Sequence, residues 1–149
     1  MAPLKISDLS VGDWVINHRG YQTKVQVLTS DGNLLCGELD AKSEHCAHLW
    51  VQDIKPIPIT AEILEKIGWR IIEKEALGED YEYDGDERVC DNDNNKIDIC
   101  EQKQGEFWHS YRSEYYLYRL YYVHQLQHLM RLYGVEEEIK FKVNLISTT

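Results

Sequence analysis

Residues 111–134 constrain the fold more than any other stretch, because they hold seven of the ten tyrosines in the chain. Residues 115–120 are predicted to be extended, and residues 122–133 are predicted to form a helix that ends at Gly134. The helix has one apolar face, made by Tyr122, Val123, Leu126, Leu129, Met130 and Tyr133. That face is predicted to be buried, which leaves the polar side chains on another face.

The same stretch carries the candidate ligand-binding residues. It holds three arginines and one glutamate, so it is basic within a protein of net charge −10. Aromatic faces interleaved with arginines can stack on a planar ring and hold a phosphate. The candidate residues are Arg112, Tyr115, Tyr116, Tyr118, Arg119, Tyr121, His124, His128 and Arg131. The alternative is that they belong to a core and an interface, since tyrosine favours strands and one strand face is buried.

The first section, residues 6–54, is predicted to be a small, strongly bent antiparallel sheet. Alternating polarity and glycine turns predict strands around Trp14 and over residues 21–29, 34–39 and 49–54. Residues 30–33, Ser-Asp-Gly-Asn, predict a hairpin turn. Short strands joined by tight turns close best as a five-stranded barrel.

Residues 56–60 are predicted to be an extended linker, because each proline biases its predecessor away from helix. Thr60 is the predicted N-cap of a helix over residues 61–67, and Gly68 is its predicted C-terminal stop. A strand over residues 69–74 follows.

Residues 73–101 hold twelve acidic and three basic residues, which accounts for nearly the whole charge excess of the chain. A hairpin turn is predicted at residues 91–95, where Asn and Asp are the residues that such turns favour. The turn begins like a calcium loop, but Lys96 stands where that loop needs glycine, so no metal is predicted. Further strands are predicted over residues 86–90, 96–101, 106–110 and 139–145.

Together these elements predict an α+β fold with mainly antiparallel sheet. Residues 1–55 form a small β-barrel-like module, and residues 56–149 form a lobe with a short helix, a sheet and one longer helix. At 149 residues the chain is long enough to bury most of its apolar surface in one core. The two lobes are therefore expected to form one compact unit.

The sequence carries no catalytic signature and implies no cofactor or metal. His124 and His128 stand four apart, but Gln125 occupies the place where the hydrolytic zinc motif needs glutamate. The cluster at residues 45–48 has histidine and cysteine but no Cys-x-x-Cys pair. The four cysteines are predicted to be packed, reduced thiols.

Composition limits the location and the partners. No window approaches the ~20 apolar residues of a membrane span, and the N-terminus lacks a signal-peptide pattern, so the cytoplasm of the cell that makes the protein is expected. An acidic balance repels phosphate backbones and argues against duplex nucleic acid as a partner. Surplus tyrosines and an incomplete sheet edge are compatible with a homo-oligomer.

Two segments together resemble a known family. They are residues 56–69, Pro-Ile-Pro-Ile-Thr-Ala-Glu-Ile-Leu-Glu-Lys-Ile-Gly-Trp, and residues 122–129, Tyr-Val-His-Gln-Leu-Gln-His-Leu. The chain resembles small proteins encoded by phages and integrated elements of gut anaerobic bacteria, in which a bent β-module precedes two such helices. The resemblance covers most of the chain except the acidic middle section. It implies a phage or mobile-element setting and carries over no catalytic residues.

Three functions are expected from these observations. The first is a non-enzymatic, counter-defence binding protein that sequesters a nucleotide-like signal of the host. The second is an adaptor or inhibitor whose acidic surface docks on a basic host protein. The third is a metal-dependent hydrolase of a small phosphorylated ligand.

Overall fold

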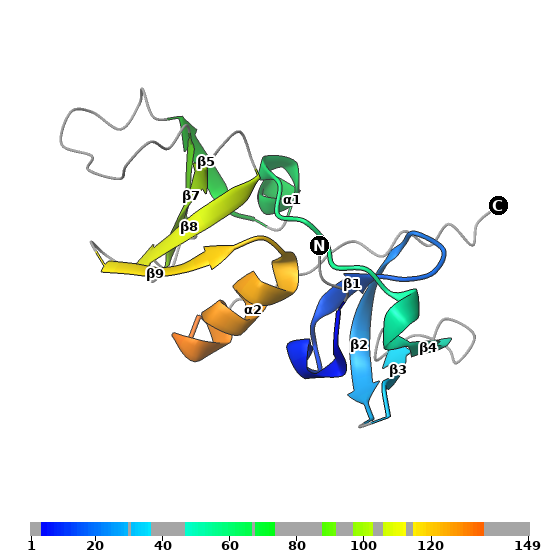
Figure 1. Ribbon diagram of the computed structural model, residues 1–149. Coiled ribbons are helices and arrows are strands. Elements are labelled where there is room, and N and C mark those ends of the chain that lie inside the picture. The colour runs from blue at the N-terminus through cyan, green and yellow to red at the C-terminus, as the bar shows by residue number, and fades with distance from the viewer. Residues whose placement is uncertain are drawn as a thin grey trace. The chain divides into compact units, whose positions relative to one another are not determined.

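The computed structural model describes residues 4–29, 31–36, 47–66, 68–73, 88–91, 97–102, 106–112 and 115–135. These residues fall into two compact units that divide between Ile57 and Pro58. Within the described residues the first unit has a four-stranded sheet and the second a five-stranded one, all antiparallel (Figure 1). The predicted α+β fold with antiparallel sheets, a short helix and a longer helix is confirmed.

The sheet of the first unit curls back on itself. Its elements are η1 (Ile6–Asp8), β1 (Trp14–Ile16), β2 (Gln22–Leu28), β3 (Asn33–Cys36), β4 (Ala47–Trp50) and η3 (Val51–Asp53). The strands pair in chain order. After η3 the chain returns to β1, where Ile16 and Lys55 exchange backbone hydrogen bonds of 2.8 and 2.9 Å. The predicted barrel-like module therefore forms, with its fifth strand reduced to one bridge among the described residues.

Apolar side chains from each strand of the first unit fill this curl. The buried cluster is Leu9, Val15, Val25, Leu34, Cys36, Leu49 and Ile54. Burial raises the pKa of the Cys36 thiol to about 11. Cys36 is therefore a packed thiol, as is the buried Cys100 of the second unit, and this part of the cysteine prediction is confirmed. Cys46 and the Cys90 side chain lie outside the described part of the chain.

The predicted strand over residues 49–54 is correct only as far as Trp50. Beyond it the chain forms the 3-10 turn η3, in which the Ile54 N–H donates to the Val51 carbonyl at 3.4 Å. The Asp53 carboxylate also accepts the Trp50 N–H, at 3.4 Å. A side chain that bonds a nearby backbone group competes with the sheet ladder, so the strand ends here. The turn leads the chain from β4 to Lys55 beside β1.

The second unit contains two helices and five strands among its described residues. They are α1 (Ala61–Lys66), β5 (Arg70–Glu73), β6 (Arg88–Asp91), β7 (Asp98–Gln102), β8 (Phe107–Arg112), β9 (Tyr115–Leu120) and α2 (Val123–Leu132). The strands lie in chain order across the sheet. The strand predicted at residues 115–120 and the helix predicted at 122–133 are confirmed as β9 and α2. The predicted strand at 139–145 and most of the turn at 91–95 lie outside the described residues.

The predicted ends of α1 are confirmed by its capping. The Thr60 hydroxyl accepts the Ile63 N–H at 3.2 Å, as an N-cap side chain does. At the other end Gly68 has a φ of +95°, which glycine adopts without steric cost. This turn lets the Trp69 N–H reach the Leu64 carbonyl at 2.9 Å.

Trp108 ties the sheet of the second unit to the segment that precedes α1. Its side chain is fully buried, and its indole N–H donates to the Ile59 carbonyl at 3.0 Å. Ile59 and Leu64 are buried in the same unit. A strand residue thus holds a segment 49 positions earlier in the chain.

Replacing Trp108 by Phe tests this bond. Phenylalanine retains most of the apolar contact but donates nothing, so the buried Ile59 carbonyl loses its donor. We expect the free energy of unfolding in urea to fall by about 1–3 kcal/mol. The matched control is Trp50→Phe, because Trp50 is 49% exposed. Equal stability changes in the two variants would show that the indole bond contributes nothing.

Candidate functional site

The β8–β9 hairpin contains a bulge that decides which side chains share a face. The paired residues are Trp108 with Leu120, His109 with Arg119, Tyr111 with Tyr116, and Arg112 with Tyr115. Between the second and third of these pairs β8 advances by two residues while β9 advances by three. The extra residue on β9 is a β-bulge, which bends a strand and redirects its side chains.

The Ser110 side chain fills the bulge. Its hydroxyl donates to the Tyr118 carbonyl at 2.6 Å and accepts the Tyr118 N–H at 2.8 Å. Ser110 is fully buried. Residues three apart point to opposite faces of a regular strand. Because of the bulge, Tyr116 and Arg119 instead lie on the same face.

That face carries a continuous cluster of rings, which we call the aromatic face. Its residues are Phe107, His109, Tyr111, Tyr116, Arg119 and Tyr121. Ring centroids lie 5.5 Å apart between Phe107 and His109, and 5.9 Å apart between Phe107 and Tyr121. His109 and Tyr116 meet edge to face at 5.1 Å. The Tyr111 and Tyr116 rings lie 5.7 Å apart.

Arg119 lies in the middle of this cluster. Its guanidinium carbon stands 4.3 Å from the centroid of the Phe107 ring, within the range of a cation–π contact. It hydrogen-bonds the side chain of Tyr121 and also that of Tyr116, and these bonds raise the pKa of Arg119. Phe107 is buried, whereas Tyr116 is 51% and Tyr121 is 40% exposed. An exposed cation therefore lies between two exposed tyrosine rings.

His109 lies beside Arg119 on the same face. Its imidazole is half-buried, and desolvation lowers its pKa from the ordinary value of 6.5, with a further contribution from the charge of Arg119. His109 is therefore neutral at pH 7. Arg119 is the cation that the described part of this face presents to a ligand.

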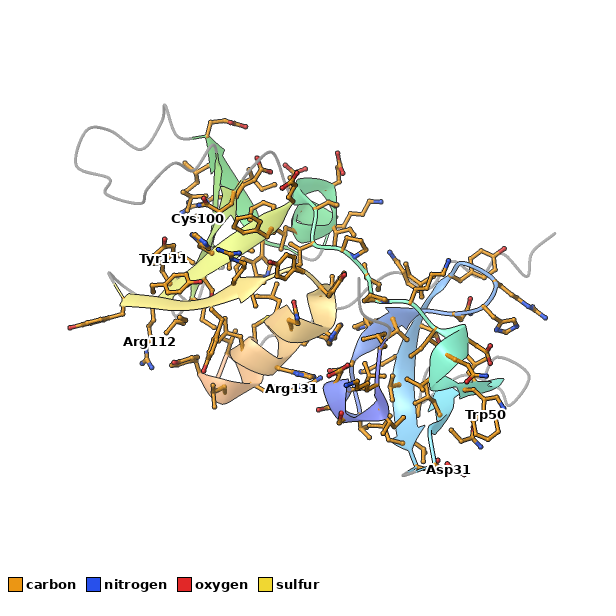
Figure 2. The ribbon with its side chains drawn as sticks, viewed as in Figure 1. Asp31, Trp50, Cys100, Tyr111, Arg112 and Arg131 are labelled. Carbon is orange, nitrogen blue, oxygen red and sulfur yellow. The ribbon has the colours of Figure 1, made fainter. Side chains whose placement is uncertain are left out.

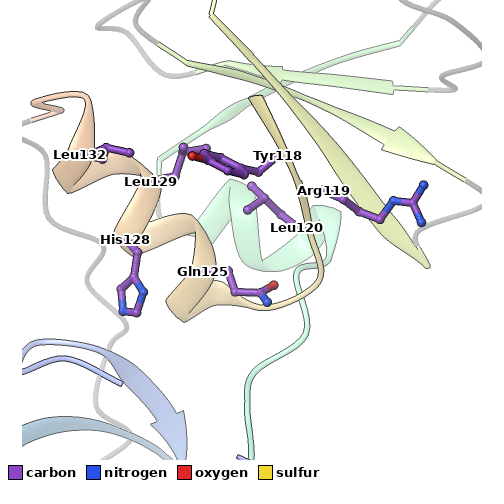
Figure 3. Close-up of a pocket in the computed structure, with 7 residues that line it drawn as sticks. All are labelled: Tyr118, Arg119, Leu120, Gln125, His128, Leu129 and Leu132. Carbon is purple, nitrogen blue, oxygen red and sulfur yellow. The ribbon is translucent and has the colours of Figure 1, made fainter. Parts of the chain in front are cut away.

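The helix-side face of the same hairpin is different in character. Tyr111 and Arg112 are neighbours on β8 and point to opposite sides (Figure 2). The Arg112 guanidinium lies 5.2 Å from the centroid of the Tyr133 ring. On this side β9 and α2 enclose an open pocket of about 310 Å³, lined by Tyr118, Arg119, Leu120, Gln125, His128, Leu129 and Leu132. Figure 3 shows the Arg119 side chain extending from β9 away from this pocket.

The remaining candidates lie on α2. His124 was expected beside His128 on a polar face of the helix, but it is buried, with 3% of its surface exposed. Its ring is stacked with the ring of Tyr122, the N-cap residue of α2, and the two ring centroids lie 5.8 Å apart. His128 meets the His124 ring edge to face, also at 5.8 Å. Arg131 is exposed in the last turn of α2.

The structure thus divides the nine predicted site residues. Tyr116, Arg119 and Tyr121 share the aromatic face. Tyr118 and His128 line the pocket, as Arg119 also does, and the other four residues belong to neither. Sequence reasoning missed Phe107, His109 and Tyr111. Their alternation was the signal that places them on one face, but the predicted strand ended at residue 110, one residue before Tyr111.

No protein-family model, curated protein or solved structure matches this chain. The aromatic face is therefore interpreted from its own side chains. Within the described residues no three His, Cys, Asp or Glu side chains are grouped so that they could hold a metal ion. The described helices are all too short or too polar to cross a membrane. His45 and the His48 side chain lie outside the described part of the chain.

Ser110→Ala tests whether the bulge depends on the serine hydroxyl. The substitution leaves the N–H and the carbonyl of Tyr118 without their side-chain partner, so we expect a loss of about 1–3 kcal/mol in the free energy of unfolding. The near-ultraviolet circular dichroism of the tyrosines should change with it. The control is Ser7→Ala, at an exposed position of the first unit. A loss no larger than that of the control would contradict this role of Ser110.

His109 gives the stability a defined dependence on pH. Its pKa is lower in the folded state than in the unfolded chain, so the unfolded chain binds the proton more readily. Stability is therefore retained above the ordinary value of 6.5 and lost as the pH falls below it toward the folded pKa. We expect His109→Asn to reduce the difference in unfolding free energy between about pH 7.5 and about pH 5.5. His18→Asn, at an exposed position, is the matched substitution, and a reduction as large as that of His109→Asn would contradict this role of His109.

Proposed function

We propose that this protein is a non-enzymatic binding protein that captures a nucleotide-like ligand on the aromatic face. The observation that carries the proposal is Arg119, which is held on the Phe107 ring between Tyr116 and Tyr121. The ligand supplies a planar ring and an anionic group. In the phage or mobile-element setting that the resemblance implies, capture removes a signal that the host uses in defence.

The side chains of the aromatic face suit the two parts of such a ligand. Exposed tyrosine rings stack on a base, and each stacked base contributes about 1–3 kcal/mol. A guanidinium donates paired, charge-assisted hydrogen bonds to phosphate oxygens. Because Arg119 already rests on Phe107 and bonds two tyrosines, it loses little freedom when the ligand binds.

The pocket between β9 and α2 is less suited to an anion. Leucines supply much of its lining, and the Arg119 side chain extends away from it (Figure 3). Besides Arg119, its polar lining residues are Gln125, His128 and Tyr118. Gln125 already accepts the N–H groups of Tyr121 and Tyr122, at 2.8 and 3.1 Å. The aromatic face therefore offers the charge that a phosphate needs.

The proposal favours capture over turnover. Sequestering a ligand needs affinity alone, and the aromatic face supplies stacking and hydrogen bonds. The adaptor alternative depends on residues 73–101, of which the described parts are residues 73, 88–91 and 97–101. These fragments of the acidic segment supply no observation that favours it. Nothing in the described residues favours the hydrolase alternative either.

A thermal melt across a panel of nucleotides tests the proposal. A ligand present at 100 times its Kd stabilises the folded state by about 2.7 kcal/mol, so the Tm should rise by several degrees. The ligand released by heating should have its original mass. An unchanged Tm with every member of the panel would contradict capture, and a released product of different mass would point to an enzyme.

Two arginine variants locate the site. Arg119→Gln removes the charge-assisted hydrogen bond to the phosphate of the ligand. The loss in binding free energy should be about 1.5–3 kcal/mol, or roughly a 10- to 150-fold rise in the Kd for the nucleotide. Arg112→Gln is matched to it, because it removes the same charge from the other side of the same hairpin. We expect Arg112→Gln to bind as the unsubstituted protein does. Equal losses in both variants would contradict an assignment to the aromatic face.

A further inference from the structure

The aromatic face has one exposed tyrosine ring on each side of Arg119. One exposed ring belongs to Tyr121, where β9 ends, and the other to Tyr116, near its start. The Phe107 ring beneath the Arg119 guanidinium lies 5.9 Å from the Tyr121 ring. The ring of His109, which pairs with Arg119, lies 5.1 Å from the Tyr116 ring. The face thus places two stacking positions around one cation.

From this arrangement we infer that the captured ligand is a dinucleotide, with its bridging phosphate on Arg119 and its two bases against Tyr116 and Tyr121. The inference rests on the proposed function and names its ligand class. A mononucleotide would occupy one exposed ring and leave the other in water. A dinucleotide contacts both rings and presents its phosphodiester charge between them.

Arg119 retains the capacity to bind a phosphate while it holds this position. The guanidinium has more N–H donors than its bonds to Tyr116 and Tyr121 require. Its central carbon lies over the Phe107 ring, 4.3 Å from the ring centroid. The side chain itself is exposed, so a phosphate oxygen can reach the remaining donors. A phosphodiester carries one charge, which matches one arginine.

The two ends of the aromatic face limit the length of the ligand. Beyond Tyr116, the Tyr111 ring is half-buried and packs edge to face against both Tyr116 and His109. Beyond Tyr121 the chain leaves the sheet, because the Tyr121 carbonyl accepts the Ile59 N–H at 3.1 Å and its N–H donates to Gln125 at 2.8 Å. The described face therefore offers a third base no exposed ring, which favours two bases over a longer strand.

Calorimetric titration with adenine ligands of increasing length tests the inference. The probes are AMP, the linear dinucleotide ApA, the cyclic 3′,3′-linked diadenylate and the linear tetranucleotide of adenosine. We expect at least one of the two dinucleotides to bind about 10-fold or more tightly than AMP, because a second base stacks. The tetranucleotide should gain no more than about three-fold over the linear dinucleotide, the statistical effect of its three adjacent pairs of bases.

Single substitutions at the two rings give a second readout. Tyr116→Ala and Tyr121→Ala should each reduce the affinity for the dinucleotide to about that for AMP. Each should lower the apparent affinity for AMP only about two-fold, because AMP can use either ring. The control is Tyr115→Ala, since Tyr115 is 69% exposed but pairs with Arg112 and so shares its side of the sheet. It should bind both probes as the unsubstituted protein does.

The outcomes separate this inference from the proposed function. Equal affinity for AMP and for both dinucleotides would overturn the inference while leaving nucleotide capture in place. A steady rise in affinity from dinucleotide to tetranucleotide would also overturn it and indicate a platform for single strands. Failure of every probe, together with an unchanged melt across the nucleotide panel, would remove both. Loss of dinucleotide binding in Tyr115→Ala alone would move the site to the other side of the hairpin.

Discussion

The hydrogen-bonded pair between the Ser110 hydroxyl and the backbone of Tyr118 is the constraint on which the candidate site depends. A regular β9 would place Tyr116 and Arg119 on opposite faces, because they are three residues apart. The extra residue accommodated by Ser110 restores them to one face. The serine is buried, so its hydroxyl makes these bonds away from bulk solvent. The Ser110–Tyr118 hydrogen bonds thus stabilise the sheet and also keep Arg119 and Tyr116 on one face.

Arg119 both supplies a positive charge and covers the ring of Phe107. Phe107 lies on the aromatic face yet only 8% of it is exposed, and the Arg119 guanidinium lies over its ring. Arginine is more weakly hydrated than lysine, so it loses less hydration when it lies against a ring. The side chain is held before any ligand arrives. The conformational entropy of this side chain is lost during folding, so more of the free energy of each new contact contributes to affinity.

The sequence predicted the elements better than it predicted which side chains meet. The period of the apolar residues and the capping residues were sufficient to predict α1, α2 and β9, because these signals depend only on neighbouring positions in the sequence. The strand expected at residues 49–54 failed at Trp50, where the Asp53 carboxylate bonds the backbone locally. The site was harder to predict, because one inserted residue reverses the face of all residues beyond it. The spacing of Tyr116, Tyr118 and Arg119 therefore indicated one mixed patch, whereas the bulge divides it between two faces.

The two faces of this hairpin also show how a tyrosine-rich stretch can stabilise the fold and leave exposed rings for the ligand that we propose. Toward the helix, Leu120 is buried and Trp108 reaches the Ile59 carbonyl, so this side holds the unit together. On the other side the rings touch one another at their edges, which fixes their orientation but leaves Tyr116 and Tyr121 exposed. Exposed rings held rigidly lose little entropy on contact, as tyrosines at other binding surfaces do. Because the aromatic face is a strand surface, a ligand bound there as we propose would have to contact several of its groups at once, and that requirement favours a ligand with more than one flat ring.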